Sequence, residues 1–78
     1  MPTVLRKDGF RFYFYSNEND EPAHVHVEKG EGDGKIWLLP KIDVAYMYNF
    51  SNAEMKQIAV IVFENYEQFK RQWNEYFD

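Results

Sequence analysis

The chain has 78 residues, enough for one domain and too few for two. It contains no cysteine, which excludes disulfides and thiolate metal sites and favours a cytoplasmic over a secreted domain of this size. The formal net charge of −4 argues against a general nucleic-acid binder. No apolar run is long enough to span a bilayer, so no membrane association is expected.

The N-terminal residues predict a β-hairpin. Residues 3–7 and 10–15 are expected to be strands, because Asp8-Gly9 between them suits a two-residue type I′ turn. That turn fixes the opposed pairs as Lys7–Phe10, Arg6–Arg11, Leu5–Phe12, Val4–Tyr13 and Thr3–Phe14. Alternation then places Leu5, Phe10, Phe12 and Phe14 on the core face.

A second hairpin is predicted after an acidic, turn-rich loop at residues 16–23. Residues 24–29 and 35–39 are expected to be its strands, with the glycine-rich residues 30–34 as the loop and Pro40 as the end. A favourable charge pair selects the register with Glu28 opposite Lys35 and His26 opposite Trp37. Residues 42–48 alternate again and predict a fifth strand.

The C-terminal residues predict a helix over about 52–77. Ser51 and Glu54 have the spacing of a capping box. Apolar residues then recur every three or four positions at Met55, Ile58, Ala59, Val62, Tyr66, Phe69, Trp73, Tyr76 and Phe77. The stripe keeps its phase through Asn65-Tyr66, the one point where the helix could be kinked into two. The expected fold is therefore a single α+β domain over residues 1–78: an antiparallel β-meander of four to five strands covered on one face by a C-terminal helix.

The stretch from His24 to Glu28 is the candidate site. In a strand, Val25 and Val27 would face the core, and His24, His26 and Glu28 would face solvent. The open sheet face would then gather Arg6, Arg11, Tyr13, His24, His26, Glu28, Lys35 and Trp37. Because Arg6 would oppose Arg11, a negative group should lie near them. That group is either an acidic side chain, such as Glu18, Asp20 or a helix carboxylate, or the phosphate or carboxylate of a ligand.

Three interpretations of this stretch stay open. The histidines could be exposed residues without a chemical role. His24, His26 and Glu28 could bind zinc or iron, but three ligands in line on one strand rarely share an ion, so no metal or cofactor is expected. The third is metal-free RNA cleavage, with His24 and His26 as the acid–base pair. Arg6, Arg11 and Lys35 would then clamp the anion, and Tyr13 or Trp37 would stack a base.

The chain resembles the small bacterial proteins grouped as domain of unknown function 4160. The matching stretches are Met1–Arg6, Tyr15–Glu18, Glu21–Glu28, Lys35–Leu38, Phe50-Ser51 and Trp73–Phe77. The resemblance implies a toxin–antitoxin-like component with a small protein partner, a cognate antitoxin or toxin, and an RNA target if this chain is the toxin. Two classes of function therefore compete: a metal-free ribonuclease-type site at His24 and His26, and a non-catalytic protein-interaction domain. Exposed sheet edges would also allow a homodimer.

Overall fold

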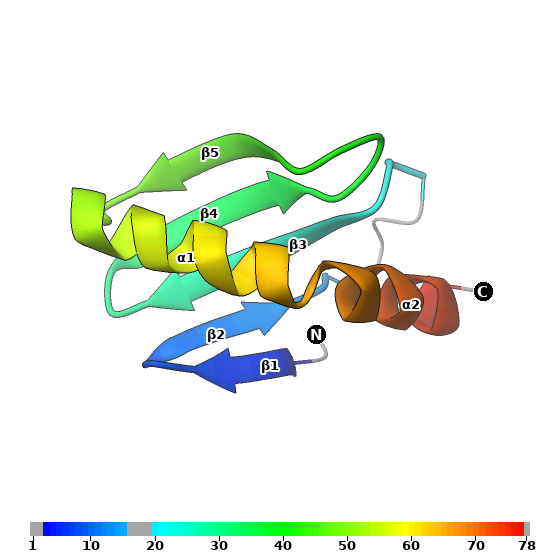
Figure 1. The fold of residues 1–78 in the computed structure, drawn as a ribbon, viewed down its shortest axis with the longest axis horizontal. Helices are drawn as coiled ribbons and strands as arrows, with labels where there is room; N and C mark the ends of the chain where they lie inside the picture. The colour runs from blue at the N-terminus through cyan, green and yellow to red at the C-terminus, as the bar shows by residue number, and fades with distance from the viewer. Residues whose placement is uncertain (1–2, 16–19, 78) are drawn as a thin grey trace.

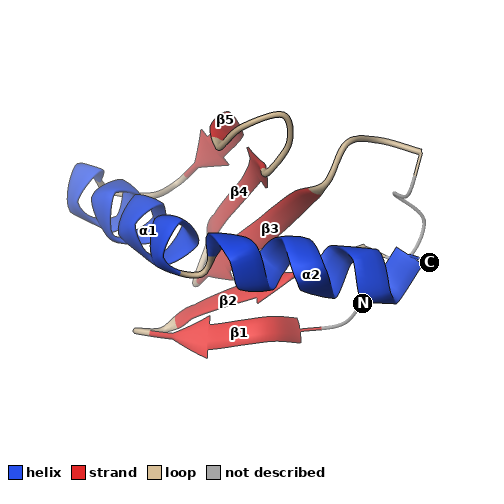
Figure 2. Ribbon diagram, turned by 45° about the vertical axis from the view of Figure 1, so that its right-hand side comes forward, coloured by secondary structure: helices blue, strands red, loops and turns tan. Residues whose placement is uncertain are grey.

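The protein is a five-stranded antiparallel sheet followed by two helices (Figure 1). The computed structural model describes residues 3–15 and 20–77. The elements are β1 Thr3–Lys7, β2 Phe10–Tyr13, β3 His24–Lys29, β4 Gly32–Trp37, β5 Asp43–Tyr48, α1 Asn52–Glu64 and α2 Tyr66–Phe77. The strands lie in chain order, and both helices lie on one face of the sheet (Figure 2), so the predicted α+β meander is confirmed. Within the described ranges, neither helix is long and apolar enough to cross a membrane.

The first hairpin has the register predicted from its turn over the three residue pairs nearest the turn. Asp8 and Gly9 have φ values of 54° and 86°, as a type I′ turn requires. The three pairs nearest the turn are those predicted, ending with Leu5 opposite Phe12. Beyond them a bulge sets Thr3 opposite Tyr13, so the predicted Val4–Tyr13 and Thr3–Phe14 pairs are wrong. The strand β2 also ends at Tyr13, two residues earlier than expected.

The second hairpin has a different register from the one predicted. Its loop is only Gly30-Glu31, and His26 lies opposite Lys35, so the Glu28–Lys35 and His26–Trp37 pairs were wrong. The reason is that Gly32 and Gly34 belong to β4. A Cβ on Gly32 would lie 2.3 Å from the Phe50 ring, so that position has no room for a side chain. The shift is two residues, which leaves the predicted faces unchanged.

The helical region is two helices that meet at Asn65. Ser51 forms the predicted capping box, since its Oγ accepts from the Glu54 N–H at 3.0 Å and its own N–H donates to Glu54 Oε1 at 2.9 Å. At the other end the Asn65 side chain donates to the Ile61 carbonyl at 2.8 Å and ends α1. The Tyr66 hydroxyl donates to the Leu38 carbonyl and holds the start of α2 against the end of β4.

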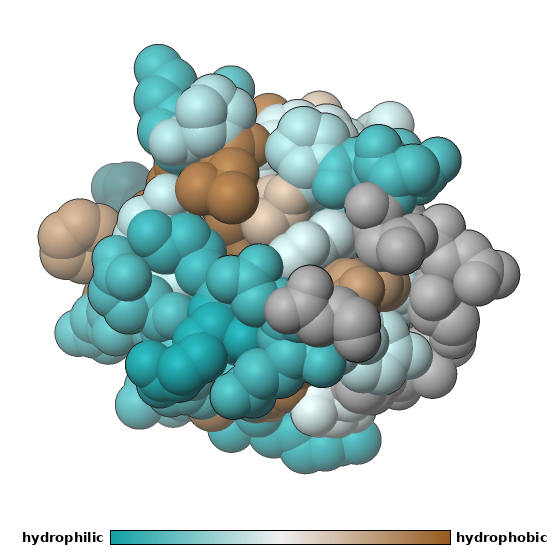
Figure 3. Space-filling model, turned by 90° about the vertical axis from the view of Figure 1, so that its right-hand side faces the viewer, coloured by the Kyte–Doolittle hydropathy of each residue, from teal (hydrophilic) through white to brown (hydrophobic). Residues whose placement is uncertain are grey.

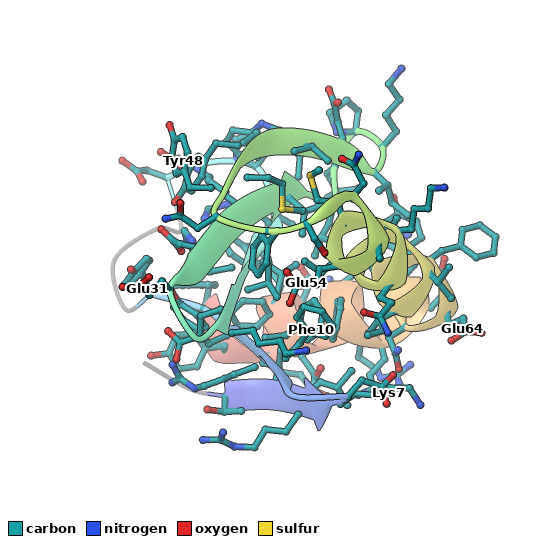
Figure 4. The ribbon with its side chains drawn as sticks, turned by 90° about the vertical axis from the view of Figure 1, so that its left-hand side faces the viewer. Lys7, Phe10, Glu31, Tyr48, Glu54 and Glu64 are labelled. Atoms are coloured by element: carbon teal, nitrogen blue, oxygen red, sulfur yellow. The ribbon has the colours of Figure 1, made fainter. Side chains whose placement is uncertain are left out.

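The core lies between the sheet and the helices, where Figure 4 shows Phe10. Its fully buried members include Phe10, Phe12, Phe14, Val25, Val27, Ile36, Leu38, Ile58, Val62 and Phe69. Two residues of the predicted helical stripe, Ala59 and Tyr76, are exposed. Ile61, which is not in the predicted stripe, is buried. The cause is the run from Ile58 to Phe63, which is apolar throughout and so does not mark its inner face.

Candidate functional site

The predicted site residues lie on neighbouring strands of the sheet. Alternation along β3 points Val25 and Val27 into the core and the two histidines the other way. The β2–β3 register sets Tyr13 opposite His26 and Arg11 opposite Glu28, and the β3–β4 register sets Trp37 opposite His24. The meander therefore brings seven of the eight predicted side chains into adjacent rows, with Arg6 at the outer strand.

The two imidazoles are buried, so the prediction that they face solvent was wrong. His24 is 0% exposed and His26 is 2% exposed. Around His26, Tyr13 stacks with ring centroids 5.4 Å apart and Tyr15 meets it edge-on at 4.4 Å. Large rings on neighbouring positions thus cover the histidines, where the alternation argument assumed an open face.

The ring of His24 joins the sheet to α2. Its centroid lies 5.3 Å from that of Trp37 and 4.8 Å from that of Trp73 in α2. Its Nδ1 lies 2.9 Å from the Pro22 carbonyl oxygen, which can only accept a hydrogen bond, so Nδ1 carries the proton. The Glu21 carboxylate lies 3.8 Å from the same nitrogen. His24 therefore combines ring packing with a bond that holds the chain entering β3.

Tyr13 is buried too, and is not placed to stack an incoming base. Burial, together with the hydrogen bond to Tyr15 and the nearby carboxylates of Asp33 and Glu28, raises the pKa of its phenol far above the ordinary value of 10.0. The phenol is neutral throughout the physiological range.

Two of the predicted anion-binding cations already have carboxylate neighbours. Arg11 Nη1 lies 3.2 Å from Glu28 Oε2, and its guanidinium lies 4.4 Å from the centroid of the Tyr13 ring. Lys35 Nζ lies 2.8 Å from Glu21 Oε1 and 4.3 Å from the centroid of the Trp37 ring.

The predicted negative group near the arginines is thus an acidic side chain of the protein. It is Glu28, beside Arg11, which the sequence predicts opposite Lys35 or as a metal ligand. Glu18, one of the expected partners, lies outside the described residues. Arg6 is exposed and lies opposite Arg11, as predicted.

Comparison with known proteins gives one match. A family model described as "Domain of unknown function (DUF4160)" matches residues 9–74, most of the chain. The chain belongs to this family. No curated protein and no solved structure matches it. The match covers β2 to β5, which include the histidine strand, all of α1 and most of α2, so these parts of this DUF4160 member lie within the family's shared region.

The fold does not bring the three proposed metal ligands together. Among residues 3–15 and 20–77, no three histidine, aspartate or glutamate side chains are grouped closely enough to hold a metal ion. His24, His26 and Glu28 are among the residues that do not converge. On one strand they follow one another at steps of about 6.6–7 Å, as the strand rise requires.

Sequence reasoning missed the residues that close over the histidines. Trp73 was assigned to the helical core stripe, and it does pack on Phe14 at 5.3 Å, but it also contacts His24. Tyr15 is not among the predicted site residues, although its ring meets that of His26 edge-on. The only hint in the sequence that the histidines would be buried is that Trp73 and Tyr15 are aromatic, because large rings can cover neighbouring side chains on a sheet.

Proposed function

We propose that this domain is the protein-binding component of a toxin–antitoxin-like pair, and that it binds its partner along the edge of β5. The observation that supports this is the exposure of apolar side chains on both faces of that strand. Val44 is 54% exposed on the helix side of the sheet, and Tyr48 is 60% exposed on the other side. Figure 4 shows Tyr48 on the side of the sheet away from α1.

The two edges of the sheet differ in the way expected for one closed and one open edge. The exposed charged residues Arg6 and Lys7 lie on β1, and such charges oppose pairing with another strand. The only charged residue of β5 is Asp43, at its first position. A partner strand hydrogen-bonded to β5 would cover Val44 on one face and Tyr48 on the other, which is the pattern of strand addition. The partner should therefore present an extended segment with apolar residues pointing both ways.

Acid–base chemistry at His24 and His26 remains the competing hypothesis. It requires substrate to reach two rings that are 0% and 2% exposed, and an anion to displace Glu28 from Arg11 and Glu21 from Lys35. Figure 3 views the molecule from the side towards which α2 runs, and hydrophilic residues cover much of it. Binding through β5 needs no such rearrangement, which is why we favour it.

The test is co-purification with the product of the adjacent gene, which is where a toxin–antitoxin-like pair would place the partner. The partner carries an affinity tag, and the dissociation constant is measured by calorimetry for the parent chain and for a Val44→Lys, Tyr48→Lys double variant. Both positions are more than half exposed, so the fold should tolerate lysine. An Asn74→Lys variant, at an exposed position of α2 away from β5, is the control. We expect the β5 variant to bind at least tenfold more weakly and the control to bind like the parent.

A second variant addresses the competing hypothesis. His26→Gln keeps a polar side chain of similar length, and circular dichroism reports whether it folds. If the parent chain cleaves RNA and a folded His26→Gln variant does not, the acid–base hypothesis is correct and ours is wrong. Partner binding that is unchanged by the β5 substitutions would equally contradict our proposal.

A further inference from the structure

The outer face of α1 is apolar, although it points away from the core. Of the residues from Ile58 to Phe63, three are buried, and the other three, Ala59, Val60 and Phe63, are exposed. Val60 is 54% exposed and Phe63 is 74% exposed. Exposed apolar side chains that stand together on a helix are candidates for a contact surface. In α2, by contrast, Glu67, Arg71, Asn74 and Glu75 are exposed.

The shape around Val60 suits a second helix. Val60 stands between two shallow hollows that share it as a lining residue. One hollow continues to Ile42, Ala59 and Phe63, and the other continues to Lys7 and Gln57. Val60 is therefore a ridge with a groove on each side, which is the surface that ridges-into-grooves packing uses.

The charges on this face indicate what the second helix is. Lys56 precedes Val60 by four residues and Glu64 follows it by four, so the three share one face of the helix. Both charged residues are exposed, and Figure 4 shows Glu64 directed away from the sheet. Within the described part of the chain, neither Lys56 nor Glu64 has an ion-pair partner.

We infer that the occupant of this face is a second copy of the chain, with the two α1 helices antiparallel about a two-fold axis at Val60. In that arrangement a residue a given number of positions before Val60 faces the residue the same number after it. Lys56 of each copy then faces Glu64 of the other, twice. An unrelated helix would need its own matching charges, whereas this surface is complementary to itself.

This dimer goes beyond the proposed function because it is centred on α1, although its groove reaches Ile42, the residue before β5. The outer face of α1 points away from the sheet, while the partner is proposed to bind at the β5 edge (Figure 1). Failure of one proposal would leave the other intact, since the first is measured by partner binding and the second by the mass of the isolated chain.

Sedimentation equilibrium of the isolated protein at micromolar to millimolar concentration tests the inference. We expect a reversible dimer. Lys56→Glu and Glu64→Lys should each weaken it roughly tenfold, because each replaces two attractive pairs by two repulsive ones. The double variant carrying both substitutions should restore the parent affinity, since it recreates both pairs with the signs exchanged. The inference would be overturned by a monomer across the whole concentration range, or by a dimer whose affinity is unchanged in both the Lys56→Glu and the Glu64→Lys variant.

Cross-linking locates the axis. The chain has no cysteine, so Val60→Cys introduces a single thiol. Residues on the axis face their own copies, and an interaxial distance of about 8–10 Å leaves their Cα atoms within disulfide reach. Gln57→Cys on the same helix is the control, because its two copies would be offset by about 9 Å along the helices. Oxidation should give a covalent dimer for the first variant only; equal cross-linking of both, or of neither, contradicts the two-fold axis at Val60.

Discussion

Replacing Gly32 by alanine tests the register of the second hairpin, on which the placement of Lys35 and Trp37 depends. The new Cβ would lie 2.3 Å from Cε1 and 2.5 Å from Cδ1 of the Phe50 ring. That ring is held in turn by Phe10, with centroids 6.1 Å apart. Overpacking of this kind costs about 1–3 kcal/mol, and the loss of glycine's freedom in the unfolded chain returns about 0.4–1 kcal/mol. We therefore expect a net destabilisation of about 1–2 kcal/mol.

The assay is urea unfolding followed by tryptophan fluorescence, with the slope of the transition as a check that the unfolded state is unchanged. A melting experiment should show a fall of about 4–8 °C for each kcal/mol lost. In a Phe50→Leu background the same glycine substitution should cost clearly less, because the shorter side chain leaves room for the methyl group. Had Gly32 been part of a loop, alanine would be neutral or stabilising, and that result would refute the observed register.

Three further predictions concern ionisation and packing. The hydrogen bond from the Ser51 N–H lowers the pKa of Glu54, so the charged form contributes stability above about pH 4.5 that is lost as the pH falls through the lowered value. Urea titrations across this range should show Glu54→Gln less stable than the parent near neutrality, with the difference vanishing in acid. Burial raises the pKa of Tyr13, so the stability it contributes is complete below pH 10.0 and is lost as the pH rises above it. Tyr13→Phe should weaken this alkaline dependence, as measured by circular dichroism. His24→Phe keeps a ring between Trp37 and Trp73 but removes the donor to the Pro22 carbonyl, and should cost about 1 kcal/mol in the same urea assay. An unchanged midpoint would show that this hydrogen bond adds nothing to the fold.

The parts of the fold that could be predicted from the sequence are those that local chemistry decides. Asp8-Gly9 fixes its hairpin because both residues must adopt positive φ, and Ser51 with Glu54 fixes the start of α1 within four residues. The second hairpin failed for the opposite reason. Whether Gly32 is a loop or a strand residue depends on Phe50, which lies 18 positions later and fills the space a side chain would take.

The candidate site shows the same division. Alternation correctly placed His24 and His26 on the face opposite Val25 and Val27. It could not give their exposure, because Trp73 reaches His24 from a helix almost 50 residues away. Burial of polar rings is a non-local property, set by whichever large side chains the remote segments bring.

Dimerisation through α1 should raise the affinity of the β5 edge for a partner that is itself a dimer. A dimer joined through α1 carries two β5 edges on one particle, so a partner that is itself dimeric would bind the second edge at a raised effective concentration. The charge reversal Glu64→Lys lies outside the β5 edge and should leave the affinity for a single partner strand unchanged. It should nevertheless weaken binding to a dimeric partner, and the compensating Lys56→Glu change should recover it. Neither substitution alters β5, so the recovery could come only from reassembly of the dimer. The experiment therefore separates two contributions to the partner affinity: the presence of two β5 edges on one particle, and the contacts that each edge makes with a partner strand.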